Sequence, residues 1–130
     1  MRKEVENWWS QSKYDFETGK YLYDGKRYGP ASFMIQQSVE KALKALYLLK
    51  VKESLTPTHS LVFLASKIEV PNQYFRFLKE LSPEFVVSRY PDSWAEAPHT
   101  YYNKELLDSY FTDAKKVLEW IKSQIKKLSD

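Results

Sequence analysis

The last part of the chain carries the feature that most restricts its fold, an apolar seam between residues 107 and 128. The apolar positions alternate in steps of four and three residues: Leu107, Phe111, Ala114, Leu118, Ile121, Ile125 and Leu128. This spacing places them on one side of an α-helix and is typical of a helix packed in a bundle. Lysines of the same segment lie largely off the seam, where solvated surface is expected.

Glycine and proline divide the rest of the chain into further helical stretches. We predict one long helix over residues 2–23, ended by Asp24-Gly25, and a second from Gly29-Pro30 to about Val51. Pro30 suits a first helical turn, where no amide donor is missed. The inward positions are expected to be Val5, Trp8 or Trp9, Ser12, Phe16, Gly19 and Tyr23 in the first helix, and Ala31, Ile35, Val39, Ala42, Leu46 and Leu49 in the second.

Shorter helices are predicted between the second and the last long helix. Two of them cover residues 59–68 and 72–81, and a third begins with Ser82 as N-cap and Pro83 as first helical residue and stops before Pro91. No stretch alternates like a β-strand. The expected fold class is therefore all-α, an antiparallel up-and-down helical bundle with three long helices and one or two short ones.

Length and composition set the remaining limits. A chain of 130 residues fits one domain, covering residues 1–130. The absence of cysteine excludes disulfides and thiolate metal sites and suits a reducing compartment. The net charge of +3 permits contact with RNA without requiring it. Because no apolar run approaches a membrane span and no signal peptide is recognisable, we expect a cytoplasmic protein.

A polar stripe interrupts the otherwise apolar second helix. Gln36, Glu40 and Lys44 are spaced by four residues and therefore share one helical face. Packing alone does not require these groups, so the stripe predicts a specified contact, either with buried polar groups or with a partner. Asp15 on the first helix is a candidate ion-pair partner for Lys41 or Lys44. His59 begins a helix with no acid beside it in sequence, which favours a structural hydrogen bond over catalysis.

Four elements, met in order along almost the whole chain, resemble the HEPN domain family. They are Trp9, Ser12, Asp15, Phe16 and Gly19; Tyr28, Ala31 and Phe33 followed by Gln36-Gln37, Glu40-Lys41 and Lys44-Ala45; His59-Ser60-Leu61 with Leu64; and Arg89-Tyr90-Pro91-Asp92. The family consists of small prokaryotic helical bundles, often encoded beside a minimal nucleotidyltransferase. The resemblance thus implies a helical bundle, a homodimer and a nucleotidyltransferase partner.

Toxins of the wider family are metal-independent ribonucleases, and the resemblance implies how such chemistry is arranged. They carry an arginine with a histidine a few residues further on, and two copies of this motif meet across a homodimer. Arg89 is the matching arginine, but His99 lies farther away than the motif has it, beyond Pro91 and Pro98. His99-Thr100-Tyr101 also resembles the end of a toxin subgroup whose tyrosine is modified with AMP by the partner enzyme.

Three hypotheses remain open at the level of sequence. The first is a HEPN protein of a toxin–antitoxin-like pair, contacting nucleotide or RNA at a dimer cleft. The second is a binding module without catalysis, and the third is a metal-independent ribonuclease that uses Arg89 and His99. The candidate binding residues are Gln36, Glu40, Lys44, Arg89, Asp92 and Tyr101. No metal site or cofactor is expected, because zinc ligand spacing and glycine-rich phosphate loops are both missing.

Overall fold

The computed structural model describes residues 2–51, 54, 57–89 and 97–129. Three long helices dominate it: α1 (Lys3–Asp24), α2 (Tyr28–Lys50) and α6 (Lys104–Ser129). Between α2 and α6 lie the short helices α3 (Leu61–Lys67), α4 (Phe75–Leu81) and α5 (Glu84–Val87), with 3₁₀ turns η1 (Asn72–Tyr74) and η3 (Pro98–Thr100). No described residue is in a strand, and the expected all-α bundle is confirmed.

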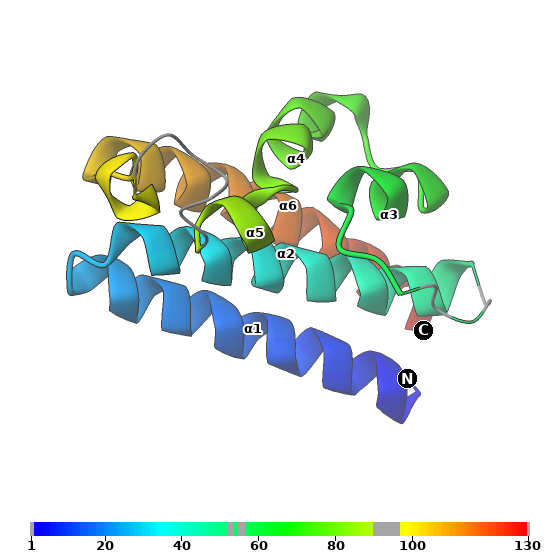
Figure 1. The fold of residues 1–130 in the computed structure, drawn as a ribbon. Helices are drawn as coiled ribbons and strands as arrows, with labels where there is room; N and C mark the ends of the chain where they lie inside the picture. Colours follow the sequence, from blue (N-terminus) through cyan, green and yellow to red (C-terminus); the bar gives the residue numbers. More distant parts are fainter. Residues whose placement is uncertain (1, 52–53, 55–56, 90–96, 130) are drawn as a thin grey trace.

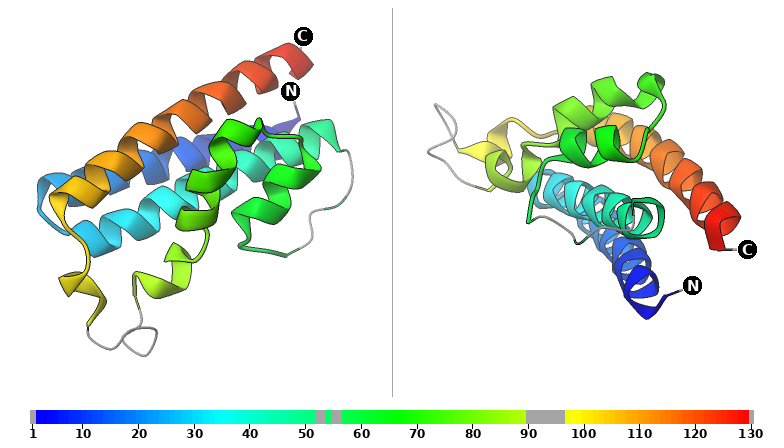
Figure 2. Two further views of the ribbon diagram at one scale, coloured as in Figure 1. Left: turned by 90° about the horizontal axis from the view of Figure 1, so that it is seen from above. Right: turned by 90° about the vertical axis from the view of Figure 1, so that its right-hand side faces the viewer.

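The helices follow an up-and-down path in which the short helices make the third leg (Figure 1). α1 and α2 form an antiparallel hairpin. The chain then returns through α3, α4 and α5, so that α6 starts near the beginning of α2 and runs in the same direction (Figure 2). The three short α-helices correspond to the three short segments predicted along the chain, one more than the one or two short helices expected for the bundle as a whole.

Small and short polar side chains hold α1 close to α2. The Ser12 hydroxyl donates to the carbonyl oxygen of Ser38 over 2.6 Å, and the Ser38 hydroxyl donates to that of Ser12 over 2.8 Å. Gly19 is buried in the same seam. Asp15 is buried and forms an ion pair with Lys41, one of the two partners expected for it. Since these groups occupy little space, the two helix backbones can approach closely.

α2 is the central helix, and its residues are buried on almost every side. α6 covers one of these sides with Leu107, Tyr110, Ala114, Val117, Ile121 and Ile125. The expected seam was therefore partly wrong. Phe111 and Leu118 are only partly buried and Leu128 is 46% exposed, because the buried stripe of the helix passes through Tyr110 and Val117 instead.

The start of α3 is capped both by its own N-cap residue and by a serine from the end of another helix. Ser60 caps α3 by accepting a hydrogen bond from the Phe63 amide over 3.1 Å. The Ser82 hydroxyl accepts from the Leu61 amide over 3.0 Å, so it also serves α3. The prediction that Ser82 caps the helix that follows it is therefore wrong, because its backbone is helical and already belongs to the end of α4. α3 starts at Leu61, two residues later than expected.

The turn between α1 and α2 adopts its left-handed conformation at Lys26 (φ 62°), not at Gly25. Beside the turn, the Tyr23 hydroxyl donates to Asp108, which also accepts from Lys104 over 3.0 Å. This contact raises the pKa of Tyr23 and lowers that of Asp108. It joins the end of α1 to the start of α6. Within the described part of the chain, no helix combines the length and apolar character needed to cross a membrane.

Candidate functional site

The polar stripe of α2 is a buried hydrogen-bonded cluster. The side chains of Gln36, Glu40 and Lys44 are almost fully buried. Lys44 Nζ lies 3.0 Å from Glu40 Oε2, and Gln36 Nε2 donates to Glu40 Oε1 over 3.2 Å. Lys44 Nζ also lies 5.3 Å from the centre of the Trp8 ring. The cluster satisfies its own buried groups, as polar atoms in a core require.

His59 completes this cluster from the surface. Its Nδ1 lies 2.9 Å from Glu40 Oε1, although the two residues are 19 positions apart in sequence. Because an ionised carboxylate can only accept, Nδ1 is the donor in this hydrogen bond. The Glu40 side chain is 3% exposed and that of His59 is 53% exposed. No acid lies beside His59 in sequence, but the fold supplies one from α2.

Arg89 lies on the same side of the molecule, just after α5. Its Nε donates to the carbonyl oxygen of Phe85 over 2.7 Å. Its Cζ lies 4.3 Å from the centre of the Phe33 ring, a cation–π contact. The Phe85 ring stacks on the His59 imidazole with centroids 4.4 Å apart.

The Phe85 ring thus contacts His59, whereas its backbone carbonyl, four residues before Arg89, accepts the bond from Arg89 Nε. We call the surface formed by Phe33, His59, Phe85 and Arg89 the α2–α5 face. It presents an imidazole that stacks on Phe85 and bonds the buried Glu40 carboxylate, and a guanidinium that lies over the Phe33 ring. These are groups that bind phosphate and stack on planar ligands.

The other predicted residues lie toward the η3 end. His99 is exposed in η3. A Cβ on Gly29 would lie 3.6 Å from the carbonyl oxygen of Ser88 and 3.9 Å from Cα of His99. The segments that carry Arg89 and His99 thus meet over Gly29. Tyr101 is 45% exposed and packs edge-to-face on Tyr102, with ring centroids 5.0 Å apart. Asp92 lies outside the described residues.

Glu84 at the start of α5 is a further buried carboxylate, which sequence reasoning missed. Glu84 is 4% exposed and accepts a hydrogen bond from the Ser32 hydroxyl over 2.6 Å. Burial raises the pKa of Glu84, and the Ser32 hydrogen bond opposes that rise. The buried Tyr102 hydroxyl lies near this carboxylate without regular hydrogen-bond geometry, and burial together with Glu84 raises the pKa of Tyr102.

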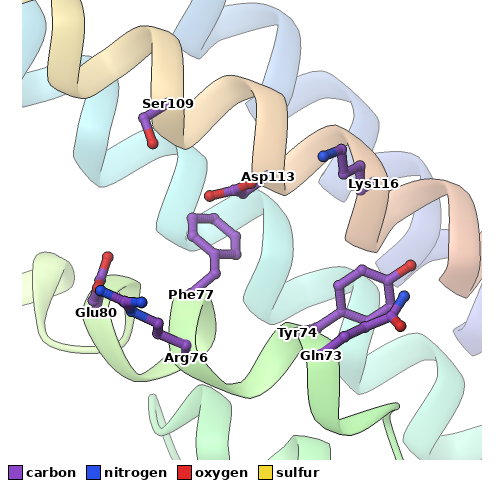
Figure 3. Close-up of a pocket in the computed structure, with 8 residues that line it drawn as sticks. All are labelled: Gln73, Tyr74, Arg76, Phe77, Glu80, Ser109, Asp113 and Lys116. Carbon is purple, nitrogen blue, oxygen red and sulfur yellow. The ribbon is translucent and has the colours of Figure 1, made fainter.

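A separate pocket of about 540 Å³ lies between α4 and α6 (Figure 3). Phe77 forms its inner wall and packs edge-to-face on Tyr110, with centroids 6.1 Å apart. The other lining residues are Gln73, Tyr74, Arg76, Glu80, Ser109, Asp113 and Lys116. None of the residues predicted from the sequence lines it. Across the described ranges, no group of three histidine, aspartate or glutamate side chains is placed to hold a metal ion.

Comparisons with known proteins agree with the resemblance seen in the sequence. ST0689, described as an archaeal HEPN homologue, has a crystal structure that superimposes with a TM-score of 0.81 at 33% identity, covering 95% of this chain and 99% of that one. The crystal structure of TT1696 from Thermus thermophilus gives a TM-score of 0.86 at 23% identity, again covering 95% of this chain and 99% of the other. At that identity the second likeness concerns the fold alone.

No curated protein matches the chain. A family model for the HEPN domain matches residues 5–124, nearly the whole length. The buried stripe, His59-Ser60-Leu61 and Arg89 all lie inside that match. The chain belongs to the HEPN domain family.

Proposed function

We propose that this HEPN protein works as a cytoplasmic homodimer, a single domain over residues 1–130, in a toxin–antitoxin-like pair with a minimal nucleotidyltransferase. In this proposal the α2–α5 face contacts a phosphate of RNA or of a nucleotide at a cleft between two copies. The observation that carries it is that Phe85 joins the two residues through different groups: its ring stacks on His59, and its carbonyl oxygen accepts a hydrogen bond from Arg89. This arrangement gives a guanidinium, an imidazole and two aromatic rings to the α2–α5 face of a chain whose net charge is only +3.

The chemistry of the face suits a phosphate ester with a planar base. A guanidinium binds phosphate oxygens through two parallel hydrogen bonds, and the Arg89 contact with Phe33 orients it. Phe33 and Phe85 offer rings at the same surface, and stacking of a base on an aromatic ring contributes about 1–3 kcal/mol. Gln36, Glu40 and Lys44 are buried within the chain, so we propose that they support binding through His59 rather than by direct contact.

Binding to fluorescein-labelled single-stranded RNA, measured by anisotropy, tests this proposal. Arg89→Ala should weaken binding about tenfold or more, since a hydrogen-bonded charge pair contributes about 1.5–3 kcal/mol. Arg76→Ala is the matched control, because Arg76 is an arginine of the neighbouring helix α4 and its side chain is 93% exposed. An equal loss of RNA affinity in both variants would mean that any surface arginine contributes through its charge. That result would contradict specific binding at the α2–α5 face.

The partner proposal needs its own experiment. Co-expression of the chain with a small nucleotidyltransferase encoded beside it should give a complex that co-purifies at a fixed ratio. Tyr101 is 45% exposed and is the tyrosine that an AMP-transferring partner would modify. Mass spectrometry should then find a single added AMP, lost in Tyr101→Phe. Failure to form a complex would leave the face as a binding module without this partner.

A second candidate is the metal-independent ribonuclease that uses Arg89 and His99. The meeting of their two segments over Gly29 favours it. It predicts RNA cleavage in the presence of EDTA that is lost in both Arg89→Ala and His99→Ala. Cleavage that continues in His99→Ala would exclude a ribonuclease that uses His99.

A further inference from the structure

We propose that Glu40 and His59 form a proton-transfer pair, with His59 as the catalytic base and Glu40 as its positioning residue. The substrate class is RNA, whose phosphodiester is held by Arg89 on the α2–α5 face. This inference rests on the proposed function of that face. It assigns the chemistry to His59, which the Arg-to-His motif does not contain, and not to His99.

The hydrogen bonds around Glu40 show that its carboxylate orients the His59 ring rather than depending on it. Glu40 Oε2 accepts from Lys44 over 3.0 Å, and Oε1 accepts from Gln36 over 3.2 Å. The carboxylate therefore has a cation and an amide donor without help from His59. The imidazole is not needed to satisfy it, so the buried carboxylate instead orients the imidazole. Carboxylates play this role for catalytic histidines in general.

The imidazole is held in one position, with one nitrogen left for chemistry. Its Nδ1 donates to Glu40 over 2.9 Å, and its ring is stacked on Phe85 with an interplanar angle of 27°. Gln36 Nε2 also donates to the backbone carbonyl of His59 over 3.3 Å, which fixes the loop that carries the ring. Among the described residues, Nε2 has no hydrogen-bond partner, and the side chain is half exposed. A neutral imidazole with Nδ1–H presents Nε2 as an acceptor, which is the form a base requires.

The reaction needs no metal and no co-reactant. Nε2 takes the proton of a ribose 2′-hydroxyl while O2′ forms a bond to phosphorus. The bond from phosphorus to the 5′-oxygen breaks, and that oxygen leaves with a proton from water. Arg89 balances the negative charge that builds on the phosphate oxygens. The imidazolium then returns its proton to solvent, and the products are a 2′,3′-cyclic phosphate and a 5′-hydroxyl.

The experiment follows cleavage of end-labelled single-stranded RNA by the full chain in EDTA. Wild type and the Arg76→Ala control should give cyclic phosphate ends, and a 2′-deoxy substrate should stay intact. His59→Ala should lower the rate about 10²–10⁴-fold, the usual contribution of a general base. Added imidazole should restore part of that rate by entering the space between Phe85 and Glu40, which a purely structural role does not allow. Glu40→Gln should lower kcat with KM little changed.

A second measurement does not depend on turnover. Proton–nitrogen correlation spectra of wild type should show the His59 tautomer with hydrogen on Nδ1, and Glu40→Gln should lose that preference. Cleavage lost in His99→Ala but kept in His59→Ala overturns the inference, as does a His59→Ala loss that imidazole never rescues. If RNA binds through Arg89 but is never cleaved, this inference fails while the proposed function stands. If RNA does not bind at all, the proposed function fails.

Discussion

Glu40 and Glu84 are two buried carboxylates with opposite surroundings. Glu40 has the Lys44 ammonium at 3.0 Å and the His59 ring at 2.9 Å. Glu84 accepts from the neutral hydroxyl of Ser32 and lies near the neutral hydroxyl of Tyr102, and burial raises its pKa. An ionised group without a counter-charge costs free energy in a low-dielectric site. An ionised Glu84 carboxylate therefore destabilises the folded state.

Glu84→Gln should stabilise the protein at neutral pH. The folded-state pKa of Glu84 is raised above its ordinary value of 4.5, so its contribution to stability is complete below that pH. This contribution is lost as the pH rises through the raised pKa, because the folded state then carries a buried charge. A glutamine amide oxygen accepts the same Ser32 hydrogen bond without that cost. Thermal melts should show a Tm a few degrees higher than wild type at pH 7, and a gap that closes toward pH 4.

Glu80→Gln is the matched control for that substitution. The Glu80 side chain is 56% exposed and pairs with the exposed Arg76, a surface contact that contributes little. It should leave the melting curve nearly unchanged across the same pH range. A stabilising effect of Glu84→Gln that grows on acidification has the wrong sign and would contradict the assignment.

Two side-chain contacts show how much of the site could be predicted from the sequence. The Asp15 pairing with Lys41 was one of two expected partners, because charge and helix order already limited the choice. The contact between His59 and Glu40 was missed, since it depends on the path of the loop after α2. The one signal for it was the stripe itself, a buried carboxylate that already suggested a partner outside α2.

At the scale of elements, the α1–α2 hairpin depends on small residues at its seam. A Cβ on Gly19 would lie 3.4 Å from the Cβ of Met34 and 3.6 Å from both the Ala31 carbonyl oxygen and the Phe111 ring. One methyl group therefore fits at van der Waals distance, and a larger side chain does not.

Gly19→Ala should accordingly raise the free energy of unfolding by about 0.5–1 kcal/mol, since alanine suits a helix interior better than glycine. Gly19→Leu should lower it by about 1–3 kcal/mol through overpacking against Met34. Urea denaturation followed by circular dichroism measures both. A destabilising alanine would mean that the helices are closer than described, and a neutral leucine would mean that they separate freely.

Ser82 and α3 form the second relation between elements. Because the Ser82 hydroxyl accepts from the Leu61 amide, Ser82→Ala should loosen the start of α3 rather than the start of α5. Loss of such a cap costs about 1 kcal/mol. Hydrogen exchange should therefore become faster at Leu61 and its helix, with α5 amides unchanged. Faster exchange confined to residues 84–87 would instead mean that Ser82 caps α5, as the sequence predicted.

The long helices were predictable because the spacing of apolar residues and the positions of glycine and proline are local signals. α1 and α2 each begin and end within about one residue of their expected bounds. The buried stripe of α6 was placed incorrectly because Tyr110 and Val117 compete with their neighbours Phe111 and Leu118 for the inward position. Only contact with α2 and α4 settles that competition, and a single sequence does not contain it.

For the whole molecule, the low net charge makes salt dependence informative. If a cleft neutralises one or two phosphates, the logarithm of RNA affinity should fall with the logarithm of salt concentration with a slope of about −0.7 to −1.4. Arg89→Ala should make that slope shallower by about 0.7, the contribution of one phosphate on a single strand. Anisotropy titrations at several salt concentrations measure the slope. A steep wild-type slope that Arg89→Ala does not alter would place the RNA on the lysine-rich surface of α6 instead.

The central position of α2 has a consequence for folding during synthesis. α2 packs against α1, which leaves the ribosome before it, and against α6, which leaves last. Until α6 emerges, the face of α2 that meets Leu107, Ala114 and Ile121 stays uncovered. We expect ribosome-bound chains stopped before residue 104 to carry a formed α1–α2 hairpin that still binds a hydrophobic chaperone. Release of that chaperone should coincide with the appearance of α6.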